Sequence, residues 1–360
     1  MKKRKGEGKP STLDALKLIS QGVKGMVTVN HLEEERFIPT LFTSYNRMTG
    51  LGGHPLRRLL AVHGKNQTGK SVLAIGIAES CRRHGHVPII YEAEWSAEKR
   101  WMNNLIKGEA AGLKMPGNLD ELIADMQQNL VNLAKAKKDG DIEEDIGCCF
   151  VVDTLTKLIP REQLETILEK GISKGYSMQA QWISIWSKII VPQIYRSNSS
   201  LIIVLQERQN IGAPKFAKQR KVTLGEALLY DVSQRIECTY SKAVERNGKV
   251  VAHQFFYCME KNKSDGNTSQ EGSFFTSTGE GDVPPGFDVV REALEEATVR
   301  KVLRSVKRDK KDWMVAEVDG KEILSLPGGT EDIREYLVQN KAALKSFVDH
   351  LNDDARRMKS

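Results

Sequence analysis

The segment Gly64–Ser71 restricts the fold of this chain more than any other feature. It fits the pattern G-x-x-x-x-G-K-[ST] and lies between an apolar run, Leu59–His63, and a helical pattern, Ser71–His84. In that position the glycines let backbone N–H groups wrap phosphates, Lys70 reaches the β and γ oxygens, and the Ser71 hydroxyl can ligate Mg²⁺. The sequence therefore predicts a nucleotide-binding P-loop made of Gly64, Lys65, Asn66, Gln67, Thr68, Gly69, Lys70 and Ser71.

Three further apolar runs, Val87–Tyr91, Cys148–Val152 and Leu201–Leu205, show no polar alternation. Such runs are typical of a parallel sheet that is covered by helices on both faces. Asn118, with Glu121 three residues later, predicts the start of a long helix between two of these strands. We therefore expect an α/β fold with a mostly parallel, twisted sheet flanked by helices.

Polar side chains follow these strands, and parallel strands end at the same edge of a sheet as the P-loop. Asp153 suits a second Mg²⁺ ligand, and the alternative is a helix-capping residue. Glu92 and Glu94 follow another strand, and chemistry alone leaves open which of them would orient or deprotonate a water. Gln206 could sense the γ-phosphate or simply begin a loop.

A basic segment, residues 207–221, comes directly after Gln206 and contains one aromatic residue. A flexible basic loop of this kind suits contacts with a phosphate backbone and insertion between bases, and the alternative is a solvated surface loop. The candidate DNA-binding residues are Arg208, Gly212, Lys215, Phe216, Lys218, Arg220 and Lys221.

The charge of the chain suggests polyanionic partners. Its 360 residues include 54 Lys and Arg against 47 Asp and Glu, a net charge of +7. The excess is concentrated, with +4 in residues 1–10, +4 in 207–221 and +6 in 299–311.

No apolar run approaches the ~18 to 20 residues of a membrane span, and no apolar leader follows the basic N-terminus. The five cysteines form no C-x-x-C pair, so we expect a soluble protein of a reducing, cytoplasmic compartment.

Together, these residues resemble the bacterial RecA recombinase family from about residue 40 to about residue 340. Phe42–Gly53 is similar to the family's segment before the P-loop, and Val152–Thr156 resembles its Walker B strand. Tyr91–Trp95 is similar to its Asp-Ala-Glu-His strand end, with Glu92 in place of Asp and Trp95 in place of His.

The resemblance implies a role for each of several residues. Glu94 would be the catalytic carboxylate and Asp153 the Walker B ligand of Mg²⁺. Trp101 would stack on the adenine, where the family has a Tyr, and Glu98 would contact the base. Gln206 would couple the γ-phosphate to the DNA-binding loop, so that Lys70, Glu94 and Gln206 form the catalytic group.

Two lysines and a second loop extend this comparison. Glu260–Lys263 is similar to the family's Lys-Asn-Lys, which implies that Lys261 and Lys263 contact the γ-phosphate held by a neighbouring protomer. A first DNA-binding loop would span roughly Arg161–Met178, with Gln181 where the family has an Arg.

The implied organisation has three parts: a basic tail and oligomerisation helix over residues 1–39, an ATPase core with DNA-binding loops over 40–284, and a small α+β DNA-capture domain over 285–360. The first part would contain a helix over Leu13–Gln21, and the last a basic helix over Val299–Lys311. The chain would end in a basic segment where some members of the family have an acidic tail.

The implied function is ATP-dependent homologous recombination with ATP and Mg²⁺ as cofactors. The protein would form helical filaments on single-stranded DNA, with ATP at the protomer interface and DNA-stimulated hydrolysis, and would exchange strands with double-stranded DNA.

Two alternatives stay open. A hexameric helicase on the same core would normally use an arginine finger where this chain has two lysines. A recombination mediator would bind ATP and DNA without productive hydrolysis. The departures at Glu92 and Trp95, with the unusual P-loop filling Lys65–Thr68, keep this alternative open.

Overall fold

The computed structural model describes residues 36–96, 98–106, 111–170, 177–209, 220–222, 226–264, 268 and 270–357. Residues 36–360 form one compact unit, and residues 1–35 are a separate unit that lies outside the described residues. The helix expected over Leu13–Gln21 falls in that part of the chain. The three-part division predicted from the sequence therefore stays a prediction.

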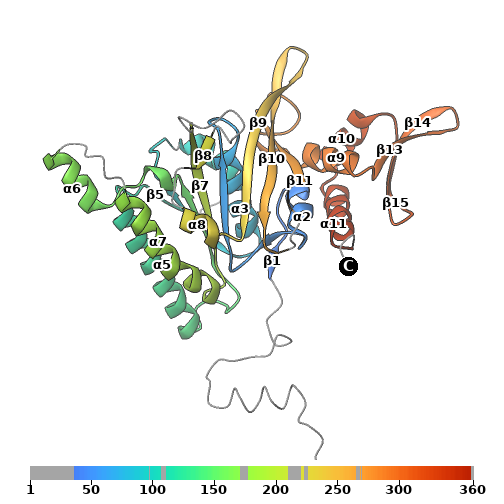
Figure 1. Cartoon of the computed structure of the whole chain (residues 1–360). Coiled ribbons are helices and arrows are strands. Elements are labelled where there is room, and N and C mark those ends of the chain that lie inside the picture. The colour runs from blue at the N-terminus through green and yellow to red at the C-terminus, as the bar shows by residue number, and fades with distance from the viewer. Residues whose placement is uncertain are drawn as a thin grey trace, which may run out of the picture. The chain divides into compact units, whose positions relative to one another are not determined.

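A ten-stranded sheet forms the centre of the described chain (Figure 1). Six neighbouring strands, in the order β9-β3-β7-β6-β4-β5, run parallel, and β10, β11, β12 and β8 are antiparallel to their neighbours. The expected α/β fold with a mostly parallel sheet is confirmed. The strands are β3 (Leu59–Gly64), β4 (Val87–Glu92), β5 (Gly112–Lys114), β6 (Cys148–Asp153), β7 (Ser200–Gln209), β8 (Arg220–Val222), β9 (Gln234–Arg246), β10 (Lys249–Asn262), β11 (Gln270–Ser277) and β12 (Gly286–Phe287).

Helices cover this sheet, and a second, three-stranded antiparallel sheet follows it in the chain. The helices are α2 (Thr43–Thr49), α3 (Lys70–Arg83), α4 (Lys99–Leu105), α5 (Leu119–Asp139), α6 (Arg161–Lys170), α7 (Ser177–Arg196), α8 (Glu226–Asp231), α9 (Val289–Val299), α10 (Thr330–Gln339) and α11 (Lys341–Arg357). The second sheet consists of β13 (Leu303–Arg308), β14 (Lys311–Val318) and β15 (Lys321–Pro327), and a short pair joins β1 (Phe37–Ile38) to β2 (His54–Pro55). In the described part of the chain, no helix is both long and apolar enough to cross a membrane.

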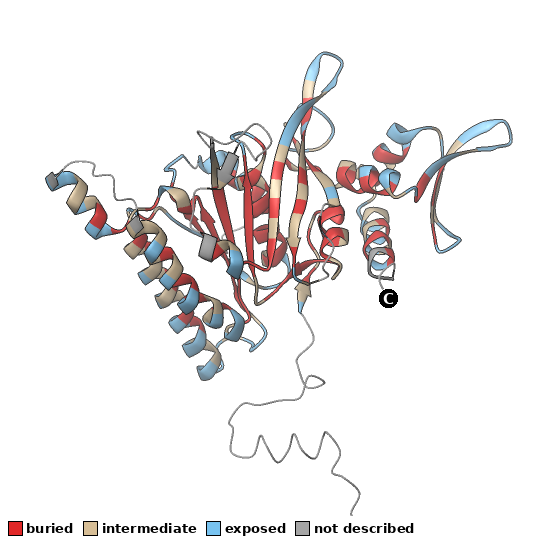
Figure 2. Ribbon diagram, in the orientation of Figure 1, coloured by how far each residue is buried: buried red, intermediate tan, exposed pale blue. Residues whose placement is uncertain are grey.

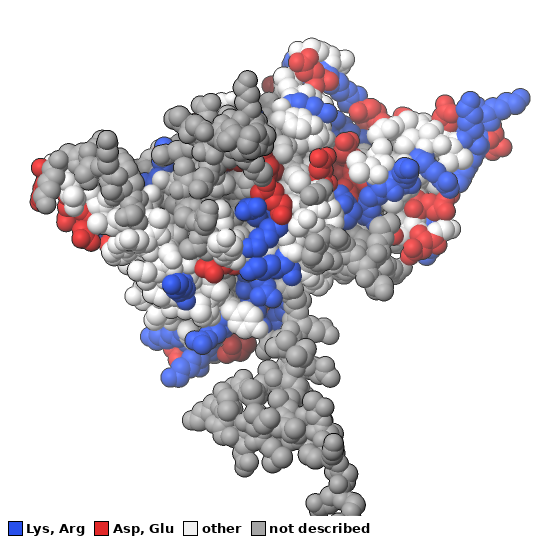
Figure 3. All heavy atoms as spheres, viewed as in Figure 1, with Lys and Arg blue, Asp and Glu red and all other residues white. Residues whose placement is uncertain are grey.

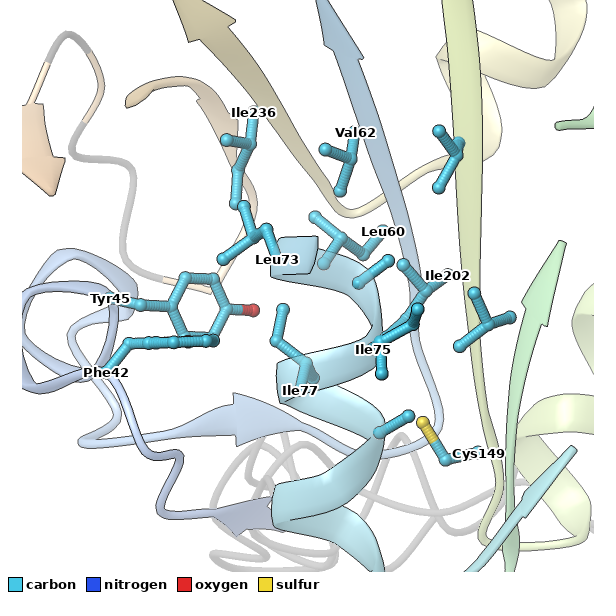
Figure 4. Close-up of a cluster of buried hydrophobic side chains, with 14 of the residues drawn as sticks. Phe42, Tyr45, Leu60, Val62, Leu73, Ile75, Ile77, Cys149, Ile202 and Ile236 are labelled. Atoms are coloured by element: carbon cyan, nitrogen blue, oxygen red, sulfur yellow. The ribbon is translucent and has the colours of Figure 1, made fainter. Parts of the chain in front are cut away.

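Alternate residues of the central strands fill two cores, one on each face of the sheet. Leu60 and Val62 point toward α3, where they pack with Leu73 and Ile77 (Figure 4). Residues 59 and 61 point to the opposite face, toward α5 and α7. Both sides of β3, β6 and β7 are consequently buried (Figure 2), which explains why these strands are apolar without alternation. The two buried cores hold the strands in register. The positions of the polar residues at the carboxyl ends of the strands, relative to one another, depend on that register.

The structure corrects two expectations about local structure. Val299–Lys311 is not a helix: α9 ends at Val299, and β13 begins at Leu303. Apolar residues at 299, 302, 303 and 306 have helical spacing, but Asp309 and Lys310 both adopt positive φ and turn the chain back into β14. Within the expected first DNA-binding loop, residues 161–170 form α6, because Leu164, Ile167 and Leu168 recur at helical spacing.

Helix α9 is joined to α2 of the core by a buried carboxylate, Glu292. Its Oε1 accepts hydrogen bonds from the backbone N–H of Ser44 (2.9 Å) and from the Ser44 hydroxyl (3.0 Å), and its Oε2 accepts one from the Thr43 hydroxyl (2.7 Å). Burial raises the pKa of Glu292 to about 7, although these hydrogen bonds lower it. The folded protein therefore favours the protonated carboxyl over a range where the unfolded chain is ionised.

This arrangement predicts a pH-dependent loss of stability. As the pH rises from about 4.5, the ordinary pKa of a Glu, to about 7, Glu292 should lower the free energy of unfolding by up to roughly 3 kcal/mol. Glu292→Gln should flatten this slope, because the amide does not ionise. Urea unfolding at pH 5 and at pH 7.5 measures the change in the free energy of unfolding. Glu295→Gln, at an exposed position of the same helix, is the control. Equal slopes in the two variants would contradict the expected role of Glu292.

Candidate nucleotide site at the carboxyl edge of the sheet

The P-loop connects β3 to α3 through three residues with positive φ. Gly64 (φ 146°), Gln67 (φ 63°) and Gly69 (φ 89°) fold the loop back over the start of α3. The Thr68 hydroxyl closes the loop by donating a hydrogen bond to the carbonyl oxygen of Lys65 (2.9 Å). Gly69 has no side chain to cap α3, so the first N–H groups of this helix suit an anionic ligand.

Lys70 is buried at the first position of α3. Its Nζ donates a hydrogen bond to the carbonyl oxygen of Lys65 (2.5 Å), within the loop itself. Burial lowers the pKa of Lys70, while the nearby carboxylates of Asp153 and Glu94 oppose that effect. The ammonium group therefore lies inside the loop that would surround a phosphate.

Asp153 ends β6 with only 9% of its surface exposed. The pKa of Asp153 is raised to about 6, mainly by burial; a hydrogen bond with Ser71 opposes this rise, and the negative charges of Glu94 and Glu92 contribute to it. Buried carboxylate and hydroxyl oxygens are ligands that suit Mg²⁺, so Asp153 and Ser71 fit this ion. No group of three or more His, Cys, Asp and Glu side chains close enough to hold a metal occurs among the described residues. Mg²⁺ usually keeps several waters and binds one or two carboxylates together with substrate phosphates, which agrees with a site that has Asp153 as its carboxylate.

The structure separates the two glutamates whose roles the sequence left open. Glu92 is buried, and its oxygens accept hydrogen bonds from the backbone N–H groups of Glu94 (3.0 Å) and Ser96 (3.1 Å). It thereby holds the turn that follows β4. Glu94 is exposed, and its Oε1 accepts a hydrogen bond from Nε2 of Gln206 at the edge of the sheet. Glu94 and Gln206 are thus brought together, as their strand-end positions predicted.

Gln206 leads into an antiparallel ribbon formed by β7 and β8, in which Glu207 pairs with Val222 and residue 209 with residue 220. The loop that this ribbon carries lies outside the described residues, and with it four of the predicted DNA-binding residues: Gly212, Lys215, Phe216 and Lys218. The other three have described backbones in the ribbon and side chains outside the description: Arg208, Arg220 and Lys221.

The residues expected to contact the base lie beyond β4. Glu98 precedes α4, and Trp101 lies in its first turn with 37% of its surface exposed. Trp95 is more exposed, at 65%, and adopts a positive φ of 57° beside Glu94. An exposed indole offers a flat face for stacking.

Lys261 and Lys263 lie at the opposite end of the sheet. Because β10 runs antiparallel to β9, and β9 parallel to β3, β10 ends near the start of β3. There the Nζ of Lys261 donates to the carbonyl oxygens of Leu229 (2.8 Å) and Tyr230 (3.0 Å), and the Nζ of Lys263 to that of Tyr230 (3.0 Å). The structure therefore does not bring these lysines to the P-loop of their own chain.

Basic side chains gather over this end of the sheet (Figure 3). A cleft of about 620 Å³ is lined there by Arg57, Arg58, Arg196 and Lys263, together with Asp231 and Tyr195. The carboxyl edge of the sheet thus carries acidic residues near the P-loop, and the opposite edge presents an excess of cations.

Three residues near the site were missed by the sequence analysis: His63, Glu207 and Glu260. His63 is the next-to-last residue of β3, directly before Gly64 of the P-loop, and is buried between the other two. A histidine as the last residue of an apolar strand, with a glutamate beside Gln206 and another beside Lys261, was the available signal.

The loop at the carboxyl edge of a largely parallel sheet defines an α/β protein of the P-loop class. The chain also has acidic side chains that end β4 and β6 at this edge, and the amide side chain of Gln206, which pairs with Gly64 in the register of β7 and β3. It belongs to the RecA family, because residues 21–270 match the model of the RecA N-terminal domain.

Curated relatives support this assignment. Protein RecA of Aquifex pyrophilus is 26% identical over 250 residues, which are 69% of this chain and 67% of the relative. Protein RecA of Mycoplasma mycoides is 24% identical over 216 residues, 60% of this chain and 58% of the relative. Protein RecA of Blastochloris viridis is 28% identical over 218 residues, 59% and 57% respectively. The similarity noted after residue 285 lies beyond the family match and stays a prediction.

Proposed function

We propose that this protein is an ATP-dependent DNA recombinase that polymerises on single-stranded DNA and exchanges strands with a homologous duplex. The observation that carries the proposal is the hydrogen bond between Gln206 and Glu94. It joins the candidate catalytic carboxylate to the strand that leads into the basic loop. A change at the nucleotide site would move Gln206 and bias that loop between two arrangements.

At the nucleotide, each residue has a distinct proposed task. The P-loop N–H groups and Lys70 would hold the phosphates, and Asp153 and Ser71 would hold Mg²⁺, which would neutralise phosphate charge. Glu94 would orient the attacking water or accept its proton. Trp101 would stack on the adenine, with Glu98 beside it.

Between protomers, Lys261 and Lys263 are proposed to complete the site of a neighbour. Their position at the edge remote from the P-loop supports this role, because it faces them away from the nucleotide of their own chain. The hairpin β13–β14 carries Lys307, Arg308, Lys310 and Lys311, and these cations suit the capture of duplex DNA.

The direct test is ATP hydrolysis measured with and without single-stranded DNA, with Lys70→Ala as the background control. Stimulation by DNA, together with helical filaments in electron micrographs, is the expected result. Closed rings with duplex unwinding would favour the helicase. ATP and DNA binding without stimulated hydrolysis would favour the mediator and refute the recombinase.

Phe216→Ala should weaken binding of single-stranded DNA roughly 5- to 150-fold, because stacking of one base on an aromatic ring contributes about 1 to 3 kcal/mol. Strand exchange should fall with it, while ATP binding changes less. Fluorescence anisotropy of labelled oligonucleotides measures the affinity, and Val131→Ala, an exposed residue of α5, is the control. Unchanged joint-molecule formation would count against the assignment of Phe216 to the DNA.

A further inference from the structure

A line of four charged side chains crosses the sheet beneath the P-loop, one from each of four adjacent strands. We call it the His63 belt: Glu207 of β7, His63 of β3, Arg235 of β9 and Glu260 of β10. His63 Nδ1 lies 2.7 Å from Oε1 of Glu207, and His63 Nε2 lies 2.8 Å from Oε2 of Glu260. Arg235 Nε forms an ion pair with the same oxygen of Glu260 at 2.8 Å.

The geometry favours a cationic histidine between two ionised carboxylates. Both ring nitrogens face carboxylate oxygens, and only the imidazolium donates hydrogen bonds from both. The side chains are nearly shielded from water, with exposures of 5% for His63, 8% for Glu207 and 13% for Glu260. Burial alone would lower the pKa of His63, but the two carboxylates outweigh it, so the pKa is raised. With Arg235 included, the belt is neutral overall.

The His63 belt lies next to Gln206, proposed to couple the nucleotide to DNA, and next to Lys261, proposed to contact the neighbouring protomer. Glu207 directly follows Gln206, which pairs with Gly64 in the register of β3 and β7. Glu260 directly precedes Lys261. The belt therefore ties the strand that leads into the DNA-binding loop to the strand that carries the interface lysines, across the strand that ends at the P-loop.

We propose that cationic His63 is a positioning residue that couples the end of β7 to the end of β10, so that DNA bound by one protomer changes its contact with the neighbour's nucleotide. This inference rests on the proposed function. Loss of the second proton of His63 would leave one ring nitrogen with a lone pair facing a carboxylate, and that contact would open.

The pH dependence of the belt follows from the charges around His63. β7 contributes Glu207, β10 contributes Glu260, β9 contributes Arg235 and Glu237, and α3 contributes Lys70, which interacts electrostatically with Glu207. Because the raised pKa belongs to the folded protein, the belt is intact below that pKa and is lost as the pH rises through it.

The first measurement is the titration of the histidine ring signals by NMR, with His63→Gln to assign the belt signal and the exposed His253 as an internal reference. We expect His63 to titrate above the ordinary 6.5. Glu207→Gln should lower its pKa, because the amide N–H can donate to an unprotonated Nδ1. An unraised pKa, or one that Glu207→Gln leaves unchanged, overturns the proposal whatever the activity.

The second measurement is the ratio of ATP hydrolysis with and without single-stranded DNA between pH 6 and pH 9. As the pH rises, the ratio for the wild type should fall roughly fivefold or more, and the midpoint of this fall should coincide with the pKa of His63. In Glu207→Gln this fall should be absent, because the belt of that variant forms with a neutral His63. The control variant His253→Gln should show the same fall as the wild type. A flat wild-type ratio with a raised His63 pKa overturns the coupling role and leaves the proposed function standing. No stimulation at any pH refutes the proposed function, and the inference with it.

Discussion

Glu94→Gln is expected to slow DNA-stimulated ATP hydrolysis by about 10²- to 10⁴-fold, the usual contribution of a positioned general base. The amide has the size of the carboxylate and can still form a hydrogen bond with Gln206. It cannot accept the proton of a water, so the chemical step is lost and ATP binding is kept. The rate constant kcat at saturating DNA, and the Kd for ATP by equilibrium binding, measure the two effects separately.

Glu92→Gln is the matched control, because Glu92 ends β4, Glu94 lies two residues further on, and both interact with Asp153 electrostatically. Glu92 accepts backbone hydrogen bonds through both oxygens, and Gln keeps one acceptor and loses the other. We therefore expect a less stable protein and a loss of kcat under about tenfold, well below the effect of a catalytic base. A larger loss of kcat for Glu92→Gln than for Glu94→Gln would move the catalytic role to Glu92.

Gly64→Ala should strongly destabilise the fold at the start of the P-loop. The backbone at Gly64 has a φ of 146°, which L-residues rarely adopt, and a Cβ there would lie within 3.0 Å of the carbonyl oxygen of Cys238 in β9. Neither strand can move without breaking the β3–β9 register. We expect a loss of at least about 3 kcal/mol in the free energy of unfolding, measured with urea.

Gly140→Ala separates the two causes of the loss expected for Gly64→Ala, which are the positive φ and the contact of the new Cβ with Cys238. Gly140 caps the end of α5 with a φ of 78°, and a Cβ there would meet no atom within 4 Å. Its cost should be limited to the left-handed conformation, about 1 to 2 kcal/mol. Equal losses in the two variants would show that the contact with Cys238 contributes nothing.

Much of the site could be predicted because the rule for parallel strands is geometric. Since β4, β6 and β7 run parallel to β3, residues that follow their apolar runs must meet near the P-loop, and Glu94, Asp153 and Gln206 do so. The long helix that Asn118 begins was predictable for a local reason: its side chain accepts a hydrogen bond from the N–H of Glu121.

Other features depended on contacts that no local pattern contains. The burial of Glu92 and the exposure of Glu94 depend on how the turn after β4 folds, because N–H groups of this turn donate hydrogen bonds to Glu92. The His63 belt joins four strands that are adjacent in space and distant in sequence. The strand over Leu303–Arg308 has apolar residues at helical spacing, and its pairing with β14 overrides that local preference.

The P-loop lies at one edge of the sheet and Lys261 and Lys263 at the opposite edge, and this separation has a consequence for assembly. If Lys261 and Lys263 act on a neighbour, the two contact surfaces differ, so the association is heterologous and head-to-tail. A two-fold dimer would then complete neither site. In an open chain of protomers the terminal P-loop lacks its lysines, so the fraction of complete sites rises with chain length. Hydrolysis per protomer would increase steeply with protein concentration at short lengths and level off once ends become rare.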